Sequence, residues 1–317
     1  MQEPREMAVQ IAVIGVGYLG RHHVRLLASL KEARLAGVVD RDPARATAVA
    51  AEFHTASFPS LDALPPEIRA VIVAVPTAAH RSVALACLKR GLDVLVEKPM
   101  AVSTAEGKEI VEAADRSGAI LQVGHTERYN PAARAAHSRI LRPRFIEAHR
   151  LGAFTSRSVD VDVILDLMIH DLDLLTSLDP SPVVSVAAVG VNALTDKMDI
   201  ANARIRLESG CVANLTASRV SVDRVRKLRV FQLDSYVGVD LAEQEVVHYR
   251  LAREGGAPAR IVREQLAVEK EEPLRVELAA FLESVSTRTK PLVSGREGLA
   301  ALEFAERVRL AIQEGGS

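Results

Sequence analysis

The 317-residue chain is long enough for two domains with separate cores, and its 48% hydrophobic and 26% charged residues are typical of a globular protein. The net charge of −1 argues against nucleic-acid partners, and a 3% aromatic content without tryptophan argues against stacking platforms for bases or bare sugars. Cys87 and Cys211 are not spaced as metal ligands are, so we expect free thiols. No run resembles a signal core or a membrane span, so we expect a cytoplasmic protein without membrane association.

The first 125 residues alternate between strand and helix patterns. Strands are predicted at 9–14, 34–39, 70–75, 93–97 and 120–124. Helices are predicted at 19–30, 43–52, 79–90 and 103–117. This alternation predicts a doubly wound parallel sheet of the Rossmann type.

A glycine loop, Gly15-Val16-Gly17-Tyr18-Leu19-Gly20, joins the first strand to the first helix. Gly15 permits a tight turn, Gly17 lets the backbone approach a pyrophosphate, and Gly20 lets the helix pack closely on the strand. The helix N-terminus adds N–H groups and a positive dipole end for phosphates. The loop therefore predicts a dinucleotide site.

Asp40 follows the second strand and lies 20 residues beyond Gly20, where a carboxylate that binds the adenosine ribose is expected. Its charge would repel a 2′-phosphate, so the sequence favours NAD. Arg41 beside it leaves NADP possible, although a solvated loop cation is the simpler interpretation.

The alternation of strand and helix patterns ends after residue 130. A segment near 144–152 and a helix near 161–178 come first, and strand-like runs follow at 183–191, 200–207, 211–218, 226–233 and 245–251. Two helices, near 274–287 and 296–313, close the chain. Several runs alternate apolar and polar residues, as half-covered antiparallel strands do. We expect a dinucleotide-binding domain at 1–125 and an α+β domain with an open, mostly antiparallel sheet at 126–317. The open face is expected to be solvated or buried against a second subunit.

Glu97-Lys98-Pro99 ends the apolar strand at 93–97. A lysine at the carboxyl end of a parallel strand points into the crevice where α/β sheets bind ligands. A buried ammonium can also lower its pKa enough to exchange protons near neutrality. The alternative is a strand that simply reaches solvent.

The predicted helix at 161–178 carries Asp166, His170 and Asp173, whose spacing places them on one face opposite an apolar face. A carboxylate beside an imidazole holds its tautomer and raises its basicity, as a proton relay requires. A solvated polar face and a metal site are the alternatives. No further ligand stands at useful spacing, so no metal is expected. Asp171 falls within the apolar face, and the pattern does not explain it.

Taken together, the glycine loop, Glu97-Lys98-Pro99 and Asp166-x-x-x-His170-x-x-Asp173 resemble the Gfo/Idh/MocA oxidoreductases. These enzymes use a nicotinamide cofactor on sugars, inositols and related alcohols, and share the two-domain layout expected above. The family often has glycine two residues after the first aspartate of the helix, where this chain has Met168.

The resemblance implies three catalytic residues. Lys98 would bind the reacting hydroxyl and help to take its proton. His170 would be the acid/base partner or relay, and Asp166 would orient the substrate or the histidine.

The resemblance also implies contacts with the cofactor. Besides the glycines, Asp40 and Arg41, these residues are Tyr18, Leu19, Pro76, Thr77, His80, Glu97 and Lys98. A helix-terminus role is the alternative for His80. His22 and His23 are expected in the first turn of the first helix, without chemistry, and Pro99 in this family often follows a cis peptide bond.

Three segments, 123–131, 149–152 and 160–173, are similar to the branch that contains UDP-N-acetylglucosamine 3-dehydrogenases of lipid A precursor synthesis. Those enzymes oxidise the sugar 3-hydroxyl before an amino group is installed. A nucleotide diphosphate needs cations, so the resemblance implies substrate binding by Arg128, Arg150 and Arg157, aided by Asn130 and the catalytic residues.

Other interpretations remain open. Each arginine alone also fits a surface salt bridge. The substrate could be an inositol or a free aldose, and a non-catalytic NAD-binding sensor is the alternative from another class. A homodimer or homotetramer through the C-terminal sheet is the family's expectation.

Overall fold

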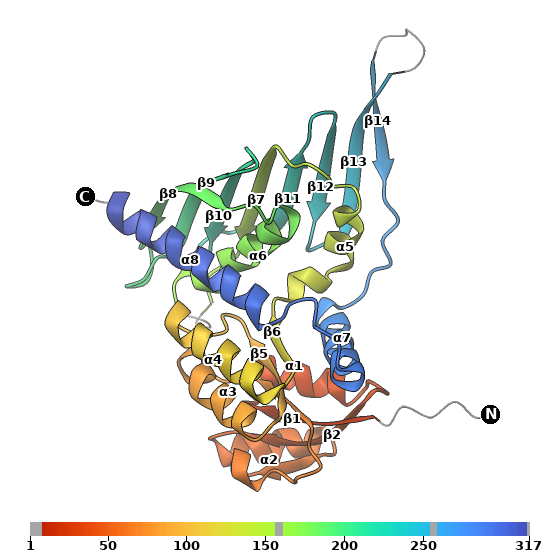
Figure 1. Ribbon diagram of the computed structural model, residues 1–317, viewed down its shortest axis with the longest axis vertical. Helices are drawn as coiled ribbons and strands as arrows, with labels where there is room; N and C mark the ends of the chain where they lie inside the picture. Colours follow the sequence, from red (N-terminus) through yellow and green to blue (C-terminus); the bar gives the residue numbers. More distant parts are fainter. Residues whose placement is uncertain (1–7, 156–160, 254–258, 316–317) are drawn as a thin grey trace, which may run out of the picture. The chain divides into compact units, whose positions relative to one another are not determined.

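The computed structural model describes residues 8–155, 161–253 and 259–315, which fall into two compact units (Figure 1). Unit 1 comprises Met1–His125 and Leu274–Leu299, and unit 2 comprises Thr126–Pro273 and Ala300–Ser317. The expected division after residue 125 coincides with a boundary between units, but the expectation that all of 126–317 forms the second domain needs correction. The segment 274–299 packs with unit 1.

Unit 1 is built on a parallel sheet of six strands in the order β3-β2-β1-β4-β5-β6. The strands are β1 Val9–Ile14, β2 Ala33–Val39, β3 Ala56–Phe58, β4 Ala70–Val73, β5 Asp93–Glu97 and β6 Leu121–Gly124. Strands β4 and β5 are buried throughout, as strands covered on both faces must be. The predicted Rossmann-type sheet is confirmed, and its order reverses between β1 and β4, where such sheets bind ligands.

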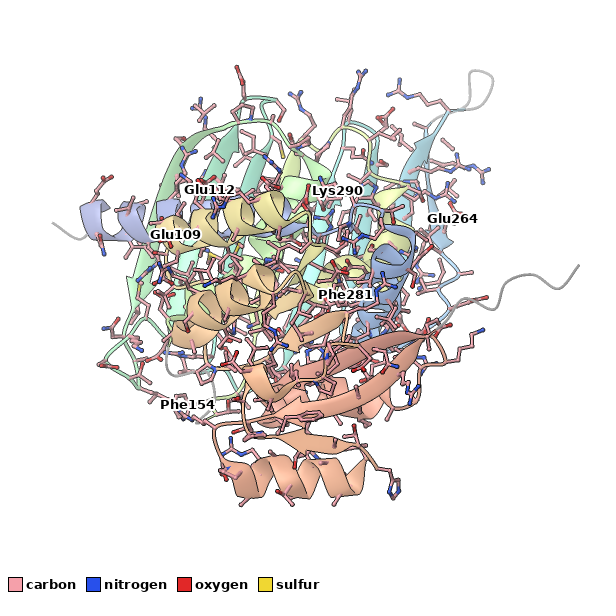
Figure 2. All side chains as sticks on the ribbon, turned by 60° about the horizontal axis from the view of Figure 1, so that its bottom comes forward. Glu109, Glu112, Phe154, Glu264, Phe281 and Lys290 are labelled. Carbon is pink, nitrogen blue, oxygen red and sulfur yellow. The ribbon has the colours of Figure 1, made fainter. Side chains whose placement is uncertain are left out.

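The helices of unit 1 are α1 Tyr18–Leu27, α2 Pro43–Glu52, α3 His80–Lys89, α4 Thr104–Ser117 and α7 Pro273–Thr287, with short 3₁₀ turns η1 Leu61–Ala63 and η2 Thr77–Ala79. Asp42 caps α2 by accepting the N–H groups of Ala44 and Arg45. Ser103 caps α4. On α7, Phe281 (Figure 2) is fully buried in the core of unit 1, which explains why this late segment leaves the second unit.

Unit 2 is built on a sheet of eight strands in the order β14-β13-β12-β11-β7-β10-β9-β8. The strands are β7 Phe145–Leu151, β8 Val183–Val191, β9 Ile200–Leu207, β10 Val212–Ser218, β11 Val225–Phe231, β12 Ser235–Asp240, β13 Glu245–Ala252 and β14 Arg260–Gln265. Only β7 and β10 pair in parallel, so the sheet is mixed but mostly antiparallel, as expected. The prediction lacked β12 and the charged edge strand β14.

The helices of unit 2 are α5 Pro131–His137, α6 Ile169–Leu178 and most of α8 Gly295–Gly315, and they lie on one face of this sheet (Figure 1). A 3₁₀ turn, η3 Thr126–Tyr129, precedes α5, and a π-helical turn, η4 Ile164–Met168, leads into α6. Burial alternates along β9, as in a sheet with one covered face. Among the described helices, none has the length and apolar character needed to cross a bilayer.

Candidate active site

The glycine loop lies at the carboxyl end of β1 in unit 1. A Cβ on Gly15 would lie 2.6 Å from the carbonyl oxygen of Ala74, and one on Gly20 would lie 1.8 Å from that of Gly15, so both positions require glycine for packing. A Cβ on Gly17 would meet no other atom within 4 Å, which leaves open space where a ligand could approach the backbone. Gly17 also caps α1 without a side-chain hydrogen bond, and the N-terminus of a helix presents N–H groups and a positive dipole end to a phosphate.

Asp40 stands at the end of β2 with its carboxylate fixed against this loop. One oxygen accepts the N–H of Val16 at 2.8 Å, and the other accepts the N–H of Asp42 at 2.9 Å. Arg41 is exposed beside it. A carboxylate held in this position suits the two hydroxyls of a ribose. Together with the open space beside the backbone of Gly17, it fits NAD as the cofactor.

The segment after β4 has two roles. Pro76 is exposed, and Thr77 is buried at the start of η2, where both remain candidates for cofactor contact. His80 is different, because its Nδ1 lies 2.8 Å from the carbonyl oxygen of Pro99 and its Nε2 lies 2.8 Å from that of Val75. The expected cofactor contact by His80 is therefore corrected: its ring joins the loops after β4 and β5.

Lys98 follows β5 directly and is half-buried, at the carboxyl end of the sheet where it was expected. The Lys98–Pro99 peptide bond is cis. Tyr18 and Leu19, at the start of α1, are exposed near the glycine loop. Unit 1 thus brings the glycine loop, Asp40 and Lys98 to one edge of the sheet.

Glu97 was expected to contact the cofactor, but its buried carboxylate points to α1. Its Oε1 lies 2.7 Å from Nε2 of His23, a residue for which no chemistry was expected. Burial acts to raise the pKa of Glu97, but the hydrogen bond and charge of His23, together with Lys98 and His80, outweigh it and lower that pKa. The sequence gives no local signal for this pair, because 74 residues separate its members.

In unit 2, Asp166 lies in the π-helical turn and His170 lies in the first turn of α6, and both are half-buried. Asp173 is buried and pairs with Nη1 of Arg128 at 3.3 Å. Asp171 is buried as well. The burial of these two carboxylates argues against the alternative of a solvated polar face on this helix. Turns of the π type are frequent at functional sites.

Arg150 does not remain available for a diphosphate, which corrects its expected role. Its Nε and Nη2 donate to the two carboxylate oxygens of Asp171 at 3.0 and 2.7 Å, and its Nη1 donates to Glu127 at 2.8 Å. Burial acts to lower the pKa of Arg150, but the two carboxylates outweigh it and raise that pKa. This buried ion-pair cluster also explains Asp171, which the apolar pattern left unexplained.

Asn130 likewise has an internal role instead of the expected substrate contact. Its Oδ1 caps α5 by accepting the N–H of Ala132, and its amide donates to Glu127 and to the carbonyl oxygen of Leu241. Arg128, with a side chain 15% exposed, stays a candidate for substrate. Arg157 lies outside the described residues.

Metal ligation has no support in the described parts of the chain, residues 8–155, 161–253 and 259–315. No group of three or more His, Cys, Asp or Glu side chains there could hold a metal ion.

Comparisons with known proteins agree with these features. The model of an oxidoreductase family with an NAD-binding Rossmann fold (GFO_IDH_MocA) matches residues 9–125, and the GFO/IDH/MocA C-terminal domain matches residues 132–232. The chain is 38% identical over 308 residues to UDP-N-acetylglucosamine 3-dehydrogenase of Acidithiobacillus ferrooxidans, covering 96% of this chain and 97% of the relative. It is 30% identical over 235 residues to scyllo-inositol 2-dehydrogenase (NAD(+)) of Bacillus subtilis, covering 68% and 69%.

Solved structures give the same result. The Acidithiobacillus ferrooxidans enzyme has a TM-score of 0.91 to this chain, with coverage of 97% of this chain and 98% of that one. Levoglucosan dehydrogenase in complex with NADH has a TM-score of 0.86 over 97% and 98% of the two chains, and at 16% identity it supports the fold alone. The two family models cover most of the sequence, and the expectation of NAD is confirmed by the Rossmann domain match. The chain therefore belongs to the Gfo/Idh/MocA family and is an NAD-dependent oxidoreductase.

Proposed function

We propose that this protein is a nucleotide-sugar dehydrogenase that oxidises the 3-hydroxyl of UDP-N-acetylglucosamine to the 3-keto sugar. The observation that carries the proposal is the 38% identity to a UDP-N-acetylglucosamine 3-dehydrogenase, which extends over 96% of this chain. Inositol dehydrogenases are less similar, at 30% identity over 68% of this chain or 26% identity over 97% of it. A likeness across both units favours a shared substrate class, because both units contribute candidate residues.

In the proposed mechanism, Lys98 binds the reacting hydroxyl and takes part in removing its proton. His170 is the acid/base partner, and Asp166 orients the substrate or the imidazole. The bound nicotinamide supplies the hydride acceptor. General acid–base help of this kind is typically worth about 10²–10⁴-fold in rate.

The diphosphate of a nucleotide sugar requires a cation, and among the arginines proposed for it Arg128 is the described one that retains solvent exposure. Its guanidinium is anchored by Asp173 on α6, the helix that also carries His170. A guanidinium held in one orientation suits phosphate oxygens. We assign Arg128 to substrate binding on this basis.

A second candidate function is an inositol dehydrogenase of the same family. The engagement of Arg150 inside unit 2 favours it, because it leaves fewer cations for a diphosphate. Relatives named inositol 2-dehydrogenase match at 34% identity over 195 residues.

The test is a substrate panel of UDP-N-acetylglucosamine, UDP-glucose, myo-inositol, scyllo-inositol and glucose, with NAD reduction followed by NADH absorbance. The expected result is the highest kcat/KM with UDP-N-acetylglucosamine, and a product whose keto group lies at C3 by NMR. Turnover with an inositol and none with the UDP-sugars rejects the proposal in favour of the second candidate. NAD binding without turnover on any compound supports a non-catalytic sensor.

We also propose that the protein is a homo-oligomer that uses the open face of the unit 2 sheet. Four aromatic side chains form a row across β7, β11, β12 and β13 on the face away from the helices: Phe145, Phe231, Tyr236 and Tyr249. Their successive ring centroids are 5.7, 4.8 and 5.6 Å apart. The chain has only seven phenylalanines and four tyrosines, so a row of four on a solvent-facing surface favours a partner there.

A further inference from the structure

A buried polar pair lies inside unit 1, directly behind the lysine. His23 is fully buried on α1, and its Nε2 lies 2.7 Å from Oε1 of Glu97, the last residue of β5. The other carboxylate oxygen of Glu97 accepts the N–H of Lys98 at 3.2 Å. The pair therefore connects the helix that follows the nucleotide loop with the backbone of the lysine.

The neighbouring strand leaves space for this carboxylate. A Cβ on Gly124, at the end of β6, would lie 3.0 Å from Oε2 and 3.2 Å from Cα of Glu97. Any larger residue at this position would press on the Glu97 side chain. Three elements, α1, β5 and β6, thus fix the orientation of one carboxylate.

The contacts of Glu97 are those of an ionised carboxylate. It accepts hydrogen bonds through both oxygens, and its pKa is lowered against the effect of burial. Nδ1 of His23 has no hydrogen-bond partner among the described residues.

A purely structural explanation for this arrangement is weak. Moving a carboxylate and an imidazole out of water is costly, and apolar residues of similar volume often give equal or greater stability. The charge also acts on a particular neighbour. The titratable groups that interact with Glu97 are His23 from α1, Lys98 from its own strand end and His80 from α3.

We propose that His23 and Glu97 are positioning residues that hold Lys98 at the end of β5. This inference rests on the proposed role of Lys98. The buried pair joins β5 to α1, and the second carboxylate oxygen of Glu97 accepts the backbone N–H of Lys98. Weakening these contacts frees the backbone that carries the amine, so the lysine is placed less accurately against its substrate.

The test is Glu97→Gln, which keeps the shape and the acceptor for His23 but removes the charge. It is assayed with the best substrate of the panel, and NAD binding is measured in parallel. We expect kcat to fall about tenfold or more, because the lysine is misplaced. The NAD dissociation constant stays unchanged.

Two controls separate the possible failures. Glu109→Gln removes an exposed carboxylate that pairs with Arg81 on the surface of unit 1 (Figure 2), and its kcat should equal that of the natural protein. Lys98→Met is the reference for the proposed function. Normal turnover in Lys98→Met rejects the role of the lysine itself. Loss of turnover in Lys98→Met, with a normal kcat in Glu97→Gln, rejects only the positioning role.

A second variant covers the possibility that Glu97→Gln does not fold. His23→Gln keeps a donor toward the carboxylate without the imidazole ring. We expect a smaller loss of kcat, with KM for NAD unchanged. An equal change in kcat and in KM for NAD would show a general disturbance of the nucleotide site and overturn the proposal.

Discussion

Lys98 is the residue on which the proposed chemistry depends most directly, because it follows β5 at the ligand edge of the sheet. Lys98→Met keeps much of the apolar stem and removes the amine. We predict that kcat falls by about 10²–10⁴-fold, the usual range for general acid–base help. NAD affinity, measured by protein fluorescence or calorimetry, should stay near that of the natural protein. Turnover within a few fold of the natural rate would contradict the assignment.

At the same scale, Asp40 is the residue that we propose to select NAD over NADP. Asp40→Ser removes the carboxylate that would bind the ribose hydroxyls, and hydrogen bonds to charged groups are worth about 1.5–3 kcal/mol. We predict that kcat/KM for NAD falls about 10- to 100-fold and that the ratio of NADP to NAD use rises. The control is Asp42→Ser, two residues away, because serine also caps helices well. An unchanged NAD preference in Asp40→Ser would contradict the ribose role.

At the scale of elements, the buried cluster of Arg150, Asp171 and Glu127 joins β7, α6 and η3. Arg150→Met leaves Asp171 buried without its paired cation and leaves Glu127 with the more distant Arg226 at 3.9 Å, and breaking a buried pair typically costs about 3–5 kcal/mol. We predict a fall in Tm by ~10 °C, measured by calorimetry, with KM for substrate unchanged below that temperature.

The matched control for Arg150→Met is Arg139→Met. Arg139 pairs with Glu264 at 3.0 Å, but the two side chains are 43% and 41% exposed, so its loss should cost no more than about 1 kcal/mol. If Arg150→Met has a normal Tm and a KM for substrate that is raised tenfold or more, Arg150 binds the substrate instead of stabilising unit 2.

The turn between β8 and β9 depends on the buried carboxylate of Asp199. It accepts hydrogen bonds from Nε of Arg219 and from three backbone N–H groups of the turn, those of Ala193, Leu194 and Thr195. Burial acts to raise the pKa of Asp199, but these hydrogen bonds outweigh it and hold that pKa well below its usual range. Because the folded pKa is depressed, the stabilisation is complete above the unfolded pKa of about 4 and is lost as pH falls below it.

Asp199→Asn is therefore predicted to lower Tm by several degrees at neutral pH. The difference from the natural protein should shrink as the pH falls toward about 3, because the natural carboxylate loses its advantage there. Thermal unfolding followed by circular dichroism at both pH values measures this. A difference that is constant with pH would mean that the charge of Asp199 contributes nothing.

Local and distant features differ in how well the sequence predicts them. The glycine loop, the strands of unit 1 and the position of Lys98 follow from short patterns, since each depends on neighbours within one strand–turn–helix unit. The partners of His23 and Arg150 do not, because 74 residues separate His23 from Glu97 and 21 separate Arg150 from Asp171. Without the fold, a buried arginine and a substrate-binding arginine have the same sequence pattern.

At the scale of the whole molecule, the chain returns to its first unit near the end, because α7 buries Leu278, Phe281, Leu282 and Val285 in that core. Periodicity predicts this helix but cannot assign it to a unit. For the open face of the unit 2 sheet, too, the sequence pattern predicts only part of the structure. Alternation predicts that one face is exposed, whereas the row of aromatic rings appears only once β7, β11, β12 and β13 are in register.

The oligomer is tested by placing a charge in the aromatic row. Phe231 lies within the row and is 37% exposed, so Phe231→Glu should leave the fold intact but prevent two apolar surfaces from associating. By size-exclusion chromatography with light scattering, we expect the natural protein at a multiple of 34.2 kDa and the variant near that mass. Val222→Glu, at a position 97% exposed outside the row, should behave as the natural protein does. A natural protein that elutes at the mass of one chain would contradict the proposed interface.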